Sequence, residues 1–63
     1  SKALDILNDR DRNIVSLKFG ANLKNQEIAQ ILAITESNVG VILYRTMKKL
    51  KKKIEEEREQ YEK

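Results

Sequence analysis

The sequence predicts an all-α fold: a small four-helix domain that contains a helix-turn-helix and ends in a long C-terminal helix. Its apolar residues recur at three- and four-residue spacing, which is the periodicity of amphipathic helices. The 63 residues include no proline and only two glycines, so few of the turn-forming residues that separate strands are present. A chain of this length makes one small domain. We therefore take residues 1–63 as a single domain, and its start at Ser1 instead of methionine leads us to expect a fragment of a longer protein.

The first two predicted helices span residues 2–7 and 9–19. The first contains a short apolar cluster of Ala3, Leu4, Ile6 and Leu7. Asn8 is the expected N-cap of the second helix, because Asp11 follows three residues later in an approximate capping box. The side chains expected to pack inward from the second helix are Ile14, Val15, Leu17 and Phe19. Gly20 follows the last apolar residue and is the expected C-cap.

The third predicted helix spans residues 25–32, and a tight turn joins it to the fourth. Its buried face is expected to consist of Ile28, Ala29, Ile31 and Leu32. In the turn, Ile34 is expected to fill the angle between the helices, and Thr35 is a good N-cap for the next helix. Many such turns have a left-handed glycine where Ala33 stands. Because alanine would cost about 1–2 kcal/mol in that conformation, we expect a slightly remodelled turn.

The fourth predicted helix spans residues 36–60 and has two different faces. Its buried stripe is expected to be Val39, Leu43, Met47, Leu50 and Ile54. At about 100° per residue, the opposite face holds Ser37, Asn38, Val41, Arg45, Lys48 and Lys52. Small polar groups near a helix N-terminus can reach base edges in the DNA major groove, while cations further along contact phosphates. This order predicts a recognition helix, in which Asn38 suits adenine, Val41 a thymine methyl, and Arg45 either guanine or phosphate.

Charge is unevenly distributed along this last helix. The net charge is +3, but residues 45–53 carry six cations and no acid, whereas residues 55–62 carry five glutamates and one arginine. Attraction to phosphate should therefore be local to residues 45–53. Lys51–Lys53 can equally be i,i+4 partners of the glutamates at 55–57 on a solvated helix, and both explanations stay open. For Arg45, Lys48 and Lys49 we favour DNA contact.

The composition excludes several function classes. The chain has no cysteine or histidine, which removes disulfides, thiol catalysis and zinc-finger ligation. Catalysis would then need paired carboxylates in a pocket or a carboxylate-bound metal, so we expect no enzyme, no cofactor and no metal site. No apolar stretch approaches the roughly 20 residues that cross a bilayer. With no visible signal peptide, we expect a cytoplasmic protein without membrane association.

The order of motifs over residues 8–50 resembles region 4 of bacterial sigma factors, especially the extracytoplasmic-function group. The elements that carry the resemblance are DRDRNIVSLKFG, Leu23, Glu27-Ile28-Ala29, ILAIT, ESNVGVILYR and TMKKL. The resemblance implies binding of double-stranded promoter DNA at the −35 element in transcription initiation. It also implies docking on the β-subunit flap of the RNA polymerase core and allows an anti-sigma factor as a further partner. We expect the isolated domain to be a monomer.

The faces of the last helix and the resemblance together indicate the DNA-binding residues. They are Lys24, Asn25, Gln26, Thr35, Ser37, Asn38, Gly40, Val41, Tyr44, Arg45, Lys48 and Lys49. Where many family members carry a basic residue, a serine and another basic residue, this chain has Gly40, Val41 and Ile42, so DNA shape should weigh more than polar base contacts. Lys24 also replaces the usual serine or threonine cap. Gly40 costs roughly 1 kcal/mol relative to alanine in a helix, which close backbone approach to DNA or a partner would explain.

Two alternatives remain open. A LuxR-type response-regulator DNA-binding domain has the same four-helix plan and dimerises through its last helix. Glu57 breaks the heptad spacing before Tyr61, and this disfavours a long homodimeric coiled coil. The other alternative is a protein-interaction module that docks on RNA polymerase or an anti-sigma factor, which apolar Val41, Ile42 and Tyr44 would suit. For Ile42 we favour flanking core, and salt dependence separates the classes because only DNA binding weakens steeply with salt.

Overall fold

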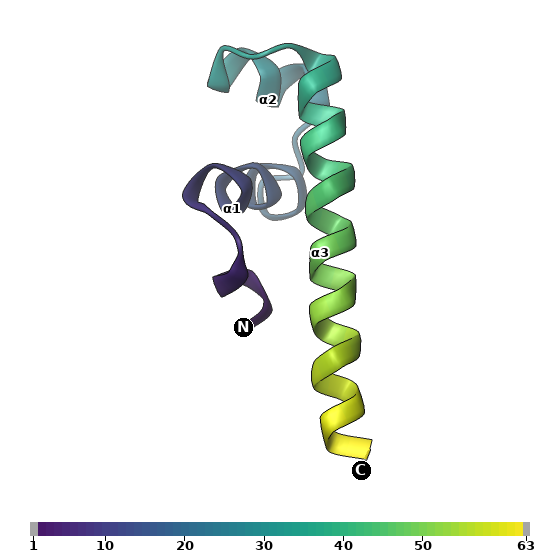
Figure 1. The fold of residues 1–63 in the computed structure, drawn as a ribbon. Helices are drawn as coiled ribbons and strands as arrows, with labels where there is room; N and C mark the ends of the chain where they lie inside the picture. The colour runs from purple at the N-terminus through teal and green to yellow at the C-terminus, as the bar shows by residue number, and fades with distance from the viewer. Residues whose placement is uncertain (1, 63) are drawn as a thin grey trace.

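The computed structural model describes residues 2–62, and the regular structure in that range is helical (Figure 1). The elements in order are the 3-10 helix η1 (Lys2–Ile6), α1 (Asp9–Val15), the π-helix η2 (Ser16–Gly20), α2 (Asn25–Leu32) and α3 (Glu36–Glu62). Residues 1 and 63 of the predicted domain lie outside the described residues. α3 is 27 residues long and runs the length of a molecule that measures 45 × 18 × 18 Å. The other elements pack along the part of α3 nearer its N-terminus, so its C-terminal end projects alone (Figure 1).

The all-helical fold class is confirmed, but the predicted count of four α-helices is wrong. Residues 2–62 contain three α-helices, because the first segment forms a 3-10 helix. That segment has only five residues, too few to nucleate a stable α-helix, and it ends with a three-residue turn in which the Leu7 N–H donates to the Leu4 carbonyl at 3.2 Å. The third helix has its predicted bounds, and the fourth extends to Glu62 instead of ending at residue 60.

The predicted second helix, residues 9–19, is α-helical only up to Val15 and then widens. The Ala21 N–H donates to the Ser16 carbonyl at 3.0 Å, which is the five-residue spacing of a π turn. Gly20 is not the C-cap that we predicted, because η2 includes it and the C-cap is Ala21. Neither glycine has a left-handed conformation within the described residues 2–62. That conformation is taken by Asn22, at φ 59°, because asparagine is one of the few residues that tolerate it.

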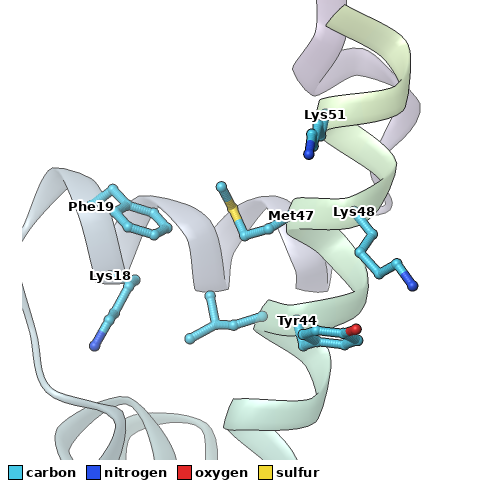
Figure 2. A pocket seen from close by; sticks show the side chains of 7 residues that line it. Lys18, Phe19, Tyr44, Met47, Lys48 and Lys51 are labelled. Carbon is cyan, nitrogen blue, oxygen red and sulfur yellow. The ribbon is translucent and has the colours of Figure 1, made fainter. Parts of the chain in front are cut away.

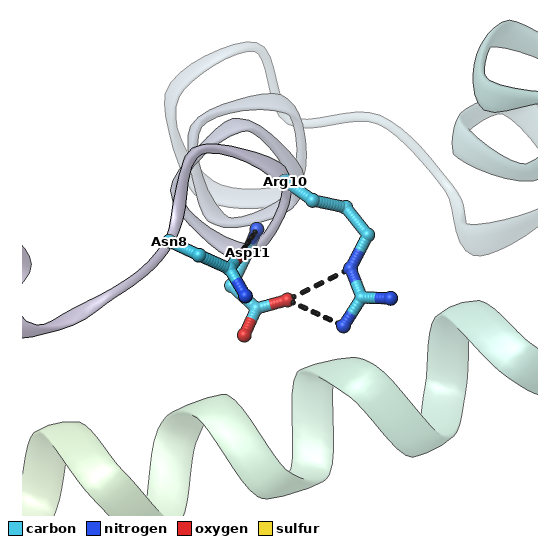
Figure 3. A network of polar contacts seen from close by, with 3 residues as sticks. All are labelled: Asn8, Arg10 and Asp11. Carbon is cyan, nitrogen blue, oxygen red and sulfur yellow. Dashed lines mark hydrogen bonds and ion pairs between the residues drawn. The ribbon is translucent and has the colours of Figure 1, made fainter.

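α1 begins at a capped turn (Figure 3). The backbone N–H of Asp11 donates to Oδ1 of Asn8 at 2.8 Å, so the predicted N-cap is confirmed. The Asp11 side chain does not complete a capping box. Its carboxylate is buried and lies 3.1 Å from both Nε and Nη2 of Arg10, which compensates the buried charge.

Two apolar clusters hold the helices together. The larger one contains Ile14, Ile28, Ala29, Val39, Ile42 and Leu43, with Leu17, Leu23, Leu32 and Ile34 packed against it. The smaller one contains Ala3, Leu7 and Leu50, with Leu4 and Val15. The first cluster joins α1 and α2 to the N-terminal half of α3, and the second fixes η1 against the middle of α3. None of the helices within residues 2–62 combines the length and apolar character needed to cross a bilayer.

Several predicted core positions are wrong. Phe19, Ile31, Met47 and Ile54 were expected to be buried and are exposed, as is Ile6 of the first apolar cluster. The inward side of α3 instead runs through Val39, Ile42, Leu43, Thr46 and Leu50. The stripe is rotated because α1 and α2 approach α3 on the side of Ile42 and Thr46. Ile54 belongs to neither core cluster and is 53% exposed.

Candidate nucleic-acid interface

α2, the connection at residues 33–35 and the N-terminal half of α3 form a helix-turn-helix. α2 lies across the N-terminal end of α3 (Figure 1). Ile28 and Ala29 of α2 are buried in the same cluster as Val39 and Leu43 of α3. Ala29 is 7% exposed, as expected for a small residue at a close helix crossing. This packing sets the angle at which α3 is presented to a partner.

The turn keeps the left-handed conformation at Ala33, and our expectation of a remodelled turn is wrong. Ala33 has φ 56° and ψ 43°. The N–H groups of Ala33 and Ile34 both donate to the Ala29 carbonyl, the latter at 3.1 Å. Ile34 also packs against the core. These bonds and this packing offset the roughly 1–2 kcal/mol that a left-handed alanine costs.

Thr35 caps α3 as predicted. Its Oγ1 accepts a hydrogen bond from the Asn38 N–H at 3.0 Å, and its carbonyl accepts from the Val39 N–H at 3.1 Å. The cap satisfies one of the backbone donors that a helix N-terminus leaves free. Thr35 therefore stabilises the first turn of α3, whether or not its own side chain reaches DNA.

The exposed face of α3 matches the predicted face. All six residues of that face are exposed, namely Ser37, Asn38, Val41, Arg45, Lys48 and Lys52. The further candidates Tyr44 and Lys49 are exposed too. Ile42 is buried at 5%, as favoured from the sequence. Lys48 Nζ lies 5.2 Å from the centroid of the Tyr44 ring, within cation–π range, and both side chains point away from the body of the domain (Figure 2). Contact of these residues with DNA stays a prediction.

The three remaining candidates for DNA contact, at the start of α2, differ in exposure. Lys24 and Gln26 are exposed, whereas Asn25 is half-buried and its Oδ1 is enclosed without a hydrogen-bond partner. The Asn25 Nδ2 lies 4.0 Å from where a Cβ on Gly40 would stand. Asn25 therefore packs between α2 and α3 and is the least available of the three. Lys24 has no acceptor for a cap; instead Glu27 Oε1 accepts from the Lys24 N–H at 2.9 Å.

A family model described as sigma-70, region 4 matches residues 3–52. The chain belongs to the sigma-70 region 4 family. Members of this family bind promoter DNA in transcription initiation together with RNA polymerase, and the family is one of DNA-binding domains, not of enzymes. No curated protein and no solved structure matches the chain. The matched range includes the whole helix-turn-helix and ends inside α3, before the acidic segment at residues 55–62.

Beside the exposed face of this region 4 domain lies a groove that the sequence did not predict. It is an open depression of about 390 Å³ between η2 and α3 (Figure 2). Its lining residues are Lys18, Phe19, Leu43, Tyr44, Met47, Lys48 and Lys51. We missed it because Phe19 and Met47 were both assigned to the core. The available signal was an excess of large apolar residues over what so small a core can bury.

The described side chains also show whether the lysines at 51–53 are paired along α3. Among the side chains at positions 3–61, none of Lys51, Lys52 and Lys53 forms an ion pair with a glutamate one turn further along α3. The solvated-helix explanation therefore has no ion pair to support it here. These cations remain available to a phosphate backbone or to an acidic partner.

Proposed function

We propose that this region 4 domain recognises the promoter −35 element by placing the N-terminal half of α3 in the DNA major groove. One observation carries the proposal. The side of α3 opposite the core begins with exposed Ser37 and Asn38 and continues to exposed Arg45, Lys48 and Lys49. A helix that enters the major groove at its N-terminus needs polar groups there and cations further along, where it meets the phosphates.

The side chains have distinct proposed roles. Asn38 pairs with an adenine edge, and Val41 contacts a thymine methyl. Arg45 contacts guanine or phosphate, while Lys48 and Lys49 contact phosphates. From α2, Lys24 and Gln26 contact the backbone, and Asn25 contributes mainly by its packing. Ser37, Gly40 and Tyr44 line the surface that approaches the DNA major groove.

The finer assignment within the family is also a proposal. We place the domain in the extracytoplasmic-function group on the motifs from Asn8 to Leu50, with residues 1–63 acting as one unit in the cytoplasm. In this proposal it binds DNA as a monomer, docks on the β-subunit flap of RNA polymerase and is open to an anti-sigma factor. The family match favours a sigma region 4 domain over a LuxR-type domain.

The test is a fluorescence-anisotropy titration against a randomised duplex pool at two salt concentrations, with sequencing of the bound fraction. We expect enrichment of one short motif and a steep loss of affinity with salt. Asn38→Ala should change the enriched motif, whereas Asn13→Ala, an exposed asparagine on α1, should not. Salt-sensitive binding without enrichment would contradict recognition of a specific element by this domain.

A second candidate function is a protein-interaction module. It is favoured by two exposed apolar side chains on the proposed reading face, Val41 and Tyr44, at 43% and 66% exposure. No duplex binding at low salt, together with salt-insensitive binding to RNA polymerase, would support this function over the first.

A further inference from the structure

From Tyr44 to Tyr61, α3 carries an exposed stripe with coiled-coil spacing. Its positions, separated alternately by three and four residues, are Tyr44, Met47, Lys51, Ile54, Arg58 and Tyr61. This is the a/d spacing of a coiled coil. The four apolar members are 66%, 42%, 53% and 91% exposed in chain order. A soluble helix seldom leaves such a stripe uncovered unless a partner packs on it.

This stripe differs from the one predicted at Leu43, Met47, Leu50 and Ile54, which Glu57 interrupts. Leu43 and Leu50 are buried in the two core clusters, so they cannot serve a partner. The exposed repeat lies one position further round the helix. In that register Glu57 is off the stripe and Tyr61 continues it.

The charges along α3 select the direction of pairing. Residues 45–53 carry six cations and no acid, and residues 55–62 carry five glutamates and one arginine. Two parallel copies would place like charges side by side. Two antiparallel copies would place the basic half of one beside the acidic half of the other, which is favourable.

The spacing also defines a register. When Lys51 lies opposite Ile54 of the second copy, Tyr44 lies opposite Tyr61 and Met47 opposite Arg58. In this register Lys48 flanks the stripe beside Glu55 of the second copy. The two-fold symmetry of such a pair makes that contact twice.

The groove between η2 and α3 lies at one end of this register. Phe19 and Met47 face each other as its apolar walls (Figure 2), and its lining also includes Lys18, Lys48 and Lys51. The segment that would enter it, residues 57–61 of the second copy, is acidic and ends in the exposed Tyr61. The chain's own segment cannot reach this groove, because α3 is one continuous helix to Glu62.

We propose that two copies of this chain pair antiparallel through residues 44–61 of α3, with the acidic end of each in the groove of the other. The association is weak, because Lys51 and Arg58 occupy central stripe positions where apolar residues are preferred. Pairing covers Tyr44 and Lys48. One consequence rests on the proposed DNA face: promoter DNA and the second copy compete for α3.

The first test is analytical ultracentrifugation of the 63-residue chain from about 10 μM to 1 mM, the range of a weak complex. We expect a dimer fraction that rises with concentration and falls with salt. Ile54→Glu should lower the association constant on the order of tenfold or more, since it places a charge in the apolar seam on both copies. Ile31→Glu is the matched control: Ile31 is 58% exposed on α2, away from the stripe, and its substitution should change nothing.

The second test examines direction and register. Lys48→Glu and Glu55→Lys should each weaken association, by on the order of tenfold, because two symmetric attractions become repulsions. The double variant should restore it, and circular dichroism should show unchanged helicity throughout. A chain that stays monomeric to 1 mM would overturn the proposal. So would a dimer that is indifferent to Ile54→Glu, or single-variant losses that the double variant does not restore.

Neither sedimentation test contains DNA, so the result for pairing does not depend on whether the domain binds DNA. Adding duplex to the dimer should dissociate it. Ile54→Glu should leave DNA affinity unchanged at nanomolar protein, where the chain is monomeric. Dimerisation without any duplex binding would leave the pairing standing and remove the DNA face.

Discussion

Thr35 and Asn38 are joined by a hydrogen bond that couples folding to recognition. The Asn38 N–H donates to Oγ1 of Thr35 at 3.0 Å, while the Asn38 side chain is exposed on the face proposed to read DNA. The residue that caps α3 thereby positions the backbone of a residue proposed to contact a base. Removing the Thr35 hydroxyl should lower stability directly and should affect DNA binding only through the position of Asn38.

Thr35→Ala should lower the free energy of unfolding by about 1 kcal/mol, because it removes the N-cap acceptor of α3. Urea denaturation followed by circular dichroism measures the change. Thr35→Ser keeps the acceptor and should cost little, because serine is at least as good an N-cap as threonine. Equal losses for the alanine and serine variants would show that the cap bond contributes little.

Ala33→Gly should stabilise the domain by about 1 kcal/mol. Ala33 has φ 56°, a conformation that glycine adopts without a steric penalty. For a domain of this size the melting temperature should rise by about 4–8 °C. A control at Ala21, which has φ −90°, should give no gain, and a destabilised Ala33→Gly variant would contradict the left-handed turn.

Gly40→Ala should also stabilise the domain, by about 1 kcal/mol, because glycine is a poor residue inside a helix. A Cβ at position 40 would lie 4.0 Å from Asn25 Nδ2, an ordinary contact. Thermal denaturation tests the gain. If the backbone at Gly40 approaches DNA closely, the same variant should bind duplex more weakly, whereas Gly20→Ala should bind it normally.

Thr46→Val should raise the free energy of unfolding by about 1 kcal/mol. Thr46 is 1% exposed and its Oγ1 has no hydrogen-bond partner, and a buried, unsatisfied hydroxyl costs about 1–3 kcal/mol. Valine fills nearly the same space without the polar atom. Thr46→Ser keeps the hydroxyl, loses a methyl and should destabilise; a valine variant less stable than wild type would indicate that the hydroxyl is satisfied.

Arg45→Glu should abolish DNA binding, because it places a negative charge on the face that meets DNA. Lys48→Ala should weaken binding to all duplexes alike and reduce the slope of log affinity against log salt by about 1, as expected for a lost phosphate contact. Anisotropy titrations at nanomolar protein measure both effects.

Arg58→Ala provides the control for these two variants. Like Lys48→Ala it removes one positive charge, about 20 Å beyond Arg45 along α3 at 1.5 Å per residue. Near-normal binding by Arg45→Glu and Lys48→Ala would rule out the proposed face of α3.

Local features of the fold were readable from the sequence where neighbours in the chain determine them. The Asn8 and Thr35 caps depend on side chains three residues from their partners, and both were predicted. The bounds of α2 follow from apolar periodicity. Ile28 and Ala29 were also expected in the core and are buried. Asn25 shows the limit, because its burial depends on Gly40 of another helix.

The sequence by itself determined the helical class, the helix-turn-helix and the exposed polar-to-basic face of α3, because periodicity and capping are local properties. Only the tertiary structure decided which way α3 is rotated. Its inward side depends on where α1 and α2 pack, and this rotation buries Ile42 and Thr46 while exposing Met47 and Ile54. The groove beside Phe19 has the same origin, since residues far apart in the chain form a surface only after the helices have docked.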